Sequence, residues 1–168
     1  MSTDPVVTPT LASARERCGK FLTFFLHDEE YGLEIEKVRE IIGMLPITRV
    51  PRSPHYIRGV INLRGKVIPI MDLRLRFAMP ASSALETCII VAEMHGMQMG
   101  MIVDAMSEVC IVGEEDIIET PFFGMHVNTD FLIGLAKHEG RIKMLLDIDR
   151  VLTPAEMGKG GNTPAVAA

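Results

Sequence analysis

The segment from Ile57 to Asp72 constrains the fold of this chain more than any other feature. It consists of two apolar runs that meet at Arg64-Gly65, followed by the acidic residue Asp72. A polar residue followed by glycine between two apolar runs is typical of a tight turn between antiparallel strands. The segment therefore predicts a β-hairpin with a cation at its turn.

The skeleton of this hairpin recurs later in the sequence. Three of its residues return after 75 residues, as the pairs Gly59 and Gly134, Gly65 and Gly140, and Asp72 and Asp147. Four other residues return after 68 residues, as the pairs Gly32 and Gly100, Val38 and Met106, Glu40 and Glu108, and Ile41 and Val109. Both echoes run in the same order in each half, which predicts a duplicated β unit.

Composition predicts a folded chain with a substantial core. Of its 168 residues, 48% are hydrophobic, and mean hydropathy is +0.24. Residues 1–17 and 155–168 lack apolar periodicity and are expected to be flexible tails around a folded domain at 18–154. No apolar run approaches the ~20 residues that cross a bilayer. With no secretory signal at the N-terminus, we expect a cytoplasmic protein without membrane insertion.

Several classes of function are disfavoured by the residues. Three widely spaced cysteines and no histidine pair at ligand spacing argue against a disulfide framework and a metal site. A net charge of −5 and the absence of tryptophan argue against nucleic acid. Gly59 to Lys66 resembles a phosphate-binding loop, but Gly59 and Gly65 are one residue too far apart, and Val67 replaces the hydroxyl residue. We expect no cofactor and no catalysis.

The remaining periodicity predicts an all-β fold with a few short helices. A helical face over Ile35 to Ile42 predicts a short helix, and a serine before Pro54 predicts a single helical turn. Asp72 and Asp147 are predicted to cap two further short helices. With the hairpin and a brief strand at 47–50, the strand signals amount to roughly nine or ten short strands. They lie at 21–26, 31–35, 88–94, 97–103, 108–112, 131–136 and 141–146.

Two groups of side chains allow two interpretations each. On the predicted helix Glu36 and Glu40 would repel each other, so a cation elsewhere is expected to pair with Glu40, and Arg64 is one candidate. The alternative is that both are ordinary solvated charges. Met97, Met99 and Met101 would share one face of a strand, either as core or as an adaptable surface for another protein.

Motifs spread through the chain resemble the CheW family of bacterial chemotaxis coupling proteins. They include Glu29-Glu30-Tyr31-Gly32, Arg49-Val50-Pro51, Gly59-Val-Ile-Asn-Leu-Arg-Gly65 and Asp72-Leu73-Arg74. The likeness covers about residues 20–152 and is weaker in the second half. It implies two intertwined five-stranded SH3-like β-barrel subdomains. No kinase core or receiver domain fits in the rest of the sequence, so a stand-alone coupling protein is the nearest likeness.

The resemblance also implies a function without catalysis. Such a protein links the cytoplasmic tip of methyl-accepting chemoreceptors to the regulatory domain of the CheA histidine kinase. The receptor hairpin is expected in the groove between subdomains, and the kinase on barrel surfaces. Val38, Glu40, Ile41 and Arg64 match family positions for receptor or kinase contact, whereas Gly59 and Gly65 match turn positions. The alternatives are an adaptor of another kinase pathway, such as pilus motility, and a small-ligand β-barrel with a polar pocket.

Overall fold

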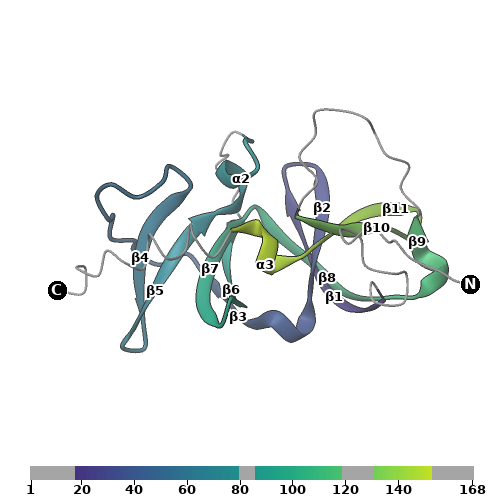
Figure 1. The fold of residues 1–168 in the computed structure, drawn as a ribbon, viewed down its shortest axis with the longest axis horizontal. Helices are drawn as coiled ribbons and strands as arrows, with labels where there is room; N and C mark the ends of the chain where they lie inside the picture. Colours follow the sequence, from purple (N-terminus) through teal and green to yellow (C-terminus); the bar gives the residue numbers. More distant parts are fainter. Residues whose placement is uncertain (1–17, 80–85, 119–130, 153–168) are drawn as a thin grey trace, which may run out of the picture.

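A computed structural model describes residues 18–79, 86–118 and 131–152 of the chain. Two curled sheets lie side by side (Figure 1). The predicted tails lie outside the described residues. Within the described residues, no helix is long and apolar enough to cross a membrane.

The first sheet, here called barrel 1, has the strand order β8-β1-β2-β11-β10-β9. Its strands are β1 (Gly19–Leu26), β2 (Glu29–Glu34), β8 (Ala105–Val112), β9 (Ile117–Ile118), β10 (Leu132–His138) and β11 (Arg141–Leu146). The second sheet, barrel 2, has the order β3-β6-β7-β5-β4. Its strands are β3 (Val38–Gly43), β4 (Ile57–Leu63), β5 (Lys66–Asp72), β6 (Cys88–Met94) and β7 (Met97–Val103). The short helices are η1 (Ile35–Lys37), α2 (Leu73–Arg76), η2 (Glu114–Asp116) and α3 (Ile148–Val151). The all-β fold with two intertwined barrels is confirmed, with the two-residue strand β9 added to the first.

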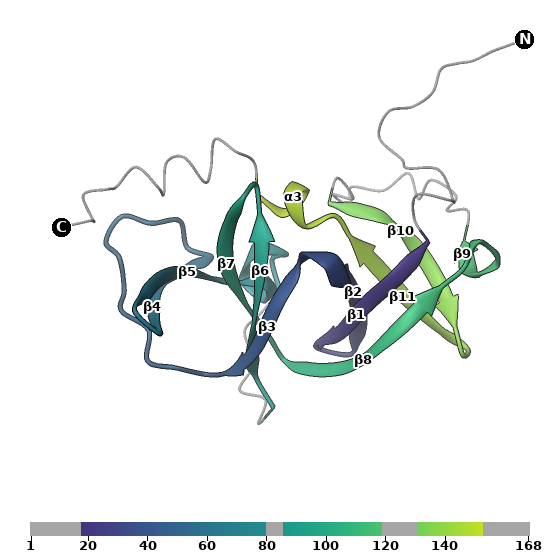
Figure 2. The same ribbon diagram turned by 90° about the horizontal axis from the view of Figure 1, so that it is seen from below.

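The repeat in the sequence corresponds to a repeat in the sheets, and the halves exchange a two-stranded hairpin: β1 and β2 lie in barrel 1 with strands of the second half, and β6 and β7 lie in barrel 2 with strands of the first half. Strand β3, from the first half of the chain, pairs with β6, while β8, from the second half, pairs with β1 (Figure 2). Each barrel contains one parallel contact at an equivalent place: Gly32 faces Leu145 in barrel 1, and Gly100 faces Ile70 in barrel 2. The barrels are therefore intertwined, since neither is built from one half of the chain alone.

The prediction of a helix over Ile35 to Ile42 was wrong. Only η1 is helical there, and β3 begins at Val38 with side chains that alternate between half-buried and exposed along the strand. Glu40 and Ile41 face Val91 and Ile90 of β6, so ladder hydrogen bonds with a distant strand decide the local conformation. Glu36 and Glu40 are therefore not neighbours on a helix.

Two other local predictions were also wrong, because both segments have less regular structure than expected. The strand expected at 47–50 is a single bridge, in which Thr48 and Val60 exchange two backbone hydrogen bonds of 2.9 Å. The helical turn expected at Ser53 is a non-helical turn in which Ser53 Oγ donates to the carbonyl of Val50. The two capped helices are confirmed: Asp72 accepts from the backbone of Arg74, and Asp147 from that of Asp149.

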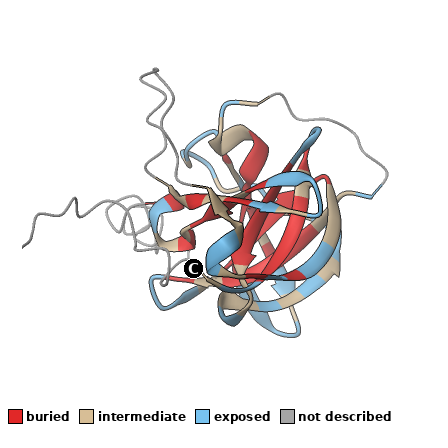
Figure 3. Ribbon diagram, turned by 90° about the vertical axis from the view of Figure 1, so that its right-hand side faces the viewer, coloured by how far each residue is buried: buried red, intermediate tan, exposed pale blue. Residues whose placement is uncertain are grey.

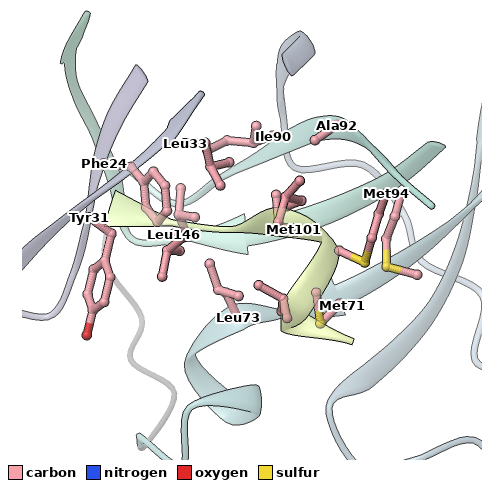
Figure 4. Close-up of a cluster of buried hydrophobic side chains, with 14 of the residues drawn as sticks. Phe24, Tyr31, Leu33, Met71, Leu73, Ile90, Ala92, Met94, Met101 and Leu146 are labelled. Atoms are coloured by element: carbon pink, nitrogen blue, oxygen red, sulfur yellow. The ribbon is translucent and has the colours of Figure 1, made fainter. Parts of the chain in front are cut away.

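The largest hydrophobic cluster lies between the barrels and draws on both sheets (Figure 4). Phe24 and Leu33 come from barrel 1, Ile90 and Met101 from barrel 2, and each is fully buried. Figure 3 shows buried positions along the inner faces of the strands and exposed turns at their ends. Two smaller clusters fill the barrels themselves. Of the methionines with two interpretations, Met99 and Met101 are core, and Met97 is 44% exposed.

Helix α2 joins the barrels through a buried ion network. Arg74 donates through Nε to Asp72 at 2.9 Å and through Nη1 to Asp104 at 2.7 Å. The backbone N–H of His27, in the β1–β2 turn of barrel 1, donates to the other oxygen of Asp104 at 2.6 Å. The side chains of Arg74, Asp72 and Asp104 are at most 7% exposed.

Helix α3 makes the equivalent junction with the charges reversed. Asp149 lies 75 residues after Arg74, pairs with Lys37 at 3.2 Å and accepts from the backbone of His95, in the β6–β7 turn, at 2.8 Å. Both Lys37 and Asp149 are more than a third exposed. The backbone N–H of His95 and the ammonium of Lys37 outweigh burial and hold the pKa of Asp149 below its ordinary value. One junction is therefore buried and the other is open to solvent.

Candidate partner-binding surface

The residues implied by the family resemblance gather at the seam where barrel 2 closes. Strands β3 and β4 are the two edges of its sheet, with β6, β7 and β5 between them. Glu40 of β3 accepts a hydrogen bond from Arg64 in the β4–β5 turn, so an ion pair joins the two edges. Arg64, the candidate cation, is thus the partner of Glu40. The conformation of Glu40 was wrongly predicted, and of its two interpretations the structure shows the pairing with Arg64.

The β4–β5 turn places Arg64 in a strained but well-defined conformation. Arg64 has φ of 52° and Gly65 has φ of 86°, the left-handed pair that two-residue hairpin turns require. The side chain of Asn62 accepts from the backbone N–H of Gly65 at 2.9 Å and fixes the turn. The Arg64 side chain is 70% exposed although it holds Glu40. Most of the side-chain surface of Arg64 therefore stays accessible to solvent.

Gly59 allows the loop before β4 to approach this strand closely. Its φ is 141°, and a Cβ atom there would lie 2.1 Å from the carbonyl oxygen of Thr48. No side chain fits, so glycine is required where the loop before β4 crosses the strand. Gly65 lies in the β4–β5 turn as expected, whereas the expectation of a turn at Gly59 was wrong: Gly59 lies inside β4, where its φ and the close approach of Thr48 require glycine.

The remaining predicted contact residues differ in accessibility. Ile41 is 44% exposed, whereas Val38 is half-buried and packs against the core between the barrels. On the outer face of the same strand, Arg39 pairs with Glu93 of β6. Val67, just after the turn, is 67% exposed. Neither Arg39 nor Val67 was among the predicted site residues; for Arg39 the reason is that a surface ion pair across strands leaves no local sequence signal.

In barrel 1, the glutamate equivalent to Glu40 has a different binding partner. Glu108, the counterpart of Glu40, is bound by the ammonium of Lys143 at 2.7 Å, and Lys143 also binds Glu30 at 2.8 Å. Lys143 is 0% and Glu30 4% exposed. The positions equivalent to Lys143 and Glu30 in barrel 2 are Ile68 and Gln98. Barrel 2 therefore lacks an internal cation, and Glu40 is held by the exposed Arg64 instead.

The pKa shifts in barrel 1 follow from this network. Burial works to lower the pKa of Lys143, but the hydrogen bonds to Glu108 and Glu30 outweigh it, and the pKa lies above its ordinary value. Burial works to raise the pKa of Glu30, but hydrogen bonds from Lys143, Ser107 and Thr23 hold it below its ordinary value. The three side chains are thus charged at neutral pH and form a permanent structural triad.

One group of side chains has the proximity that a metal ion requires. Glu108, His138 and Glu139 offer ligand atoms within 4.8 Å of one another. Glu108 is already bound by Lys143, and His138 lies 3.7 Å from Glu139. Such an arrangement is common among surface ion pairs, so it gives no argument for a metal centre.

Comparisons with known proteins identify the family. Residues 20–156 match the family model described as CheW-like domain. A protein named chemotaxis protein CheW from Klebsiella aerogenes is 39% identical over 139 residues, which are 82% of this chain and 84% of that protein. The Rhizobium meliloti protein of the same name is 37% identical over 138 residues, 82% of this chain and 89% of that one.

A solved structure agrees with these relatives. The scaffolding protein TtCheW from Thermoanaerobacter tengcongensis superimposes with a TM-score of 0.72 and 36% identity, over 80% of this chain and 92% of that one. The sequence and the fold therefore identify the same family. This chain belongs to the CheW-like domain family.

Proposed function

We propose that this chain is a non-catalytic adaptor that couples methyl-accepting chemoreceptors to the CheA histidine kinase in bacterial chemotaxis. The observation that carries the proposal is the match of residues 20–156 to the CheW-like domain. Relatives named chemotaxis protein CheW and a solved neighbour titled a scaffolding protein support it. The regulatory domain of the kinase and the cytoplasmic tip of the receptor are the proposed partners.

An adaptor of this kind works by holding its partners in a fixed relation. Receptor state can bias the kinase only if contacts through the adaptor differ in free energy between the receptor's states. The fully buried core between the barrels suits this role, because a closely packed body transmits displacement instead of absorbing it. We place the protein in the cytoplasm, attached to membrane-bound receptor arrays through protein contacts, with no nucleic acid partner and no membrane insertion of its own.

We further propose that Glu40, Ile41 and Arg64 contact a receptor or kinase, with Val38 supporting them from the edge of the core. The proposal is supported by the exposure of Ile41 and Arg64 and by the fixed geometry of the turn. An arginine that is 70% exposed loses water from a large surface when a partner covers it, which suits it to a specific contact. Gly59 and Gly65 hold the backbone that presents it.

The two alternatives are less favoured. An adaptor of a pilus-motility kinase would share the fold, but the relatives' names refer to chemotaxis. A small-ligand barrel would need an enclosed polar interior, whereas the interior of barrel 2 holds Ile61, Ile68 and Ile70, each at most 2% exposed. Aliphatic side chains thus occupy the place of a ligand.

Titration of the purified chain against a CheA regulatory domain and a soluble receptor-tip fragment, each separately, tests the proposal. Arg64→Glu is expected to weaken at least one of the two complexes at least tenfold (~1.4 kcal/mol). Lys137→Glu is the matched control, since Lys137 is an exposed cation on β10 of the other barrel. Full affinity of Arg64→Glu for both partners would remove Arg64 from the contact surface.

A charge exchange tests whether the Glu40–Arg64 pair matters as a unit. Glu40→Arg and Arg64→Glu are each expected to weaken binding, and the double exchange is expected to recover part of the combined loss by restoring the pair. A double-mutant cycle measures the coupling. Strict additivity of the two losses would show that the two residues act independently.

A further inference from the structure

Barrel 2 carries a positive surface that extends beyond Arg64, the cation of the proposed contact surface. From Ile41 to Met71 the sequence contains five lysines and arginines and no aspartate or glutamate, although the chain has 22 acidic residues and a net charge of −5. The loop from Met44 to Tyr56 lies within this stretch, at the end of the molecule where β4 begins (Figure 1). The local field there is opposite in sign to that of the whole chain.

A hollow in this loop is lined by cations. A pocket of about 340 Å³ is bounded by Arg49, Arg52, His55 and Arg58, with Pro51 and Pro54 in its walls. An adjoining hollow of about 350 Å³ shares Arg49, His55 and Arg58. These volumes are at the small end of the ~300–1,000 Å³ typical of small-molecule sites.

The arginines of this pocket differ from the others in the folded part of the chain. Six arginines in the described residues bind a carboxylate or a backbone carbonyl: Arg39, Arg64, Arg74, Arg76, Arg141 and Arg150. Arg49, Arg52 and Arg58 bind no carboxylate or carbonyl within residues 18–79, 86–118 and 131–152. The three guanidiniums thus line one hollow, where they repel one another, and no carboxylate of the described residues offsets the repulsion.

The backbone of the loop that carries these cations is held by contacts at its base and in its interior. The loop is closed at its base by the two Thr48–Val60 hydrogen bonds and by the close crossing at Gly59. Inside the loop, Tyr56 is 9% exposed, its carbonyl accepts from the backbone of Asp72 at 2.8 Å, and its ring contacts that of His55. A fixed loop backbone removes part of the entropic cost of binding, and the exposed arginine side chains are ordered by the anion itself.

We propose that this pocket binds the phosphoryl groups of a small phosphorylated compound. Guanidinium groups match the geometry of phosphate and carboxylate oxygens, and both are bound by paired N–H donors. One arginine can saturate the two oxygens of a carboxylate. A phosphoryl group has three terminal oxygens and nearly two negative charges, so it is the anion that uses two or three guanidiniums together.

Isothermal titration calorimetry with inorganic pyrophosphate as the probe tests the site, using the full chain at constant ionic strength. Binding is expected to be saturable with one site per chain. The variant with Arg49→Gln and Arg58→Gln is expected to bind at least tenfold more weakly, since it loses several charge-assisted hydrogen bonds. The control variant carries Lys66→Gln and Lys137→Gln, which remove the same charge from exposed lysines outside the pocket.

The outcomes separate a built site from a general attraction to positive charge. The proposal is supported if only the arginine variant loses binding. In the parent chain, the changes in amide chemical shift on adding pyrophosphate should be confined to residues 47–58. Equal losses in both variants, undiminished binding by the arginine variant, or heat that never saturates would overturn it. A glutamate-rich peptide is titrated in parallel, and a peptide that binds where pyrophosphate does not would refute the ligand class. Circular dichroism of both variants checks that each is folded.

Discussion

Replacing Lys143 tests whether the buried triad of barrel 1 is structural. Lys143→Ile would leave Glu30, 4% exposed, without the ammonium that now lies 2.8 Å away. Removing one partner of a buried ion pair costs ~3–5 kcal/mol, because the remaining charge stays buried. Arg141, which is 3.3 Å from Glu30 but 59% exposed, offsets ~1 kcal/mol or less. Glu108 is 43% exposed and returns to water. We therefore expect a loss of about 3 kcal/mol in the free energy of unfolding.

Barrel 2 suggests the compensating change. Its equivalent residues are Ile68 and Gln98, so the double variant Lys143→Ile with Glu30→Gln gives barrel 1 the uncharged pair that barrel 2 already contains. The free energy of unfolding of this variant is expected to lie within about 1 kcal/mol of that of the parent chain, because replacing a whole buried ion pair is often neutral.

Urea unfolding followed by far-ultraviolet circular dichroism measures both changes, and Lys137→Ile on the surface of β10 is the control. Two results would refute the reasoning. Either the single variant loses less than about 1 kcal/mol, or the double variant is as unstable as the single one.

The pH dependence of the same comparison has a defined sign. The pKa of Glu30 lies below its ordinary value of 4.5, so its contribution is present above pH 4.5 and lost as pH falls through the lower folded value. The pKa of Lys143 lies above its ordinary value of 10.5, so its contribution is present below pH 10.5 and lost as pH rises through the higher folded value. The stability of the parent chain relative to the double variant should therefore fall at both extremes. A difference that is flat with pH would contradict the assignment.

Two further stability predictions follow from the fold. Gly59→Ala is expected to cost at least ~3 kcal/mol or to prevent folding, because its Cβ would lie 2.1 Å from a backbone carbonyl oxygen. The control is Gly43→Ala, whose Cβ meets nothing within 4 Å and which should be near neutral. Equal urea midpoints for the two variants would refute the close crossing at Gly59. Arg74→Met should cost ~3–5 kcal/mol because it removes the cation that two buried carboxylates share, whereas Lys37→Met at the open junction should cost ~1 kcal/mol or less and should lose its effect at high salt. Similar losses for both, measured by thermal unfolding at low and high salt, would show that the two junctions are not of different strength.

Local sequence chemistry predicted the parts of the fold that local chemistry controls. The hairpin at Arg64-Gly65 forms because two adjacent residues accept a left-handed backbone. The helices after Asp72 and Asp147 form because a carboxylate caps the next turn. The repeat predicted two equivalent units, since the spacing of glycines and acids survives even where the side chains between them differ.

The wrong predictions concern segments whose conformation depends on pairing with a strand that is distant in the sequence. Residues 35–42 fit a helical spacing, but Val38 to Gly43 form β3, because β6, about fifty residues away in the sequence, supplies a ladder partner. The exchange of the hairpins β1–β2 and β6–β7 between the halves could not be predicted from the repeat, since both the exchanged and the unexchanged pairings fit it. Similarly, the triad joins Lys143 to Glu30 across 113 residues. Only the recurrence of Glu40 as Glu108 marked that the position matters.

An adaptor of this kind must hold a receptor and a kinase together at the same time. The direct measurement is co-sedimentation of a CheA regulatory domain with a receptor-tip fragment on a solid support, in the presence and absence of this chain. The account predicts that the kinase domain is retained in proportion to added chain and that Arg64→Glu lowers this retention while Lys137→Glu leaves it unchanged. Retention that does not depend on the chain, or a chain that binds one partner and never both, would contradict it.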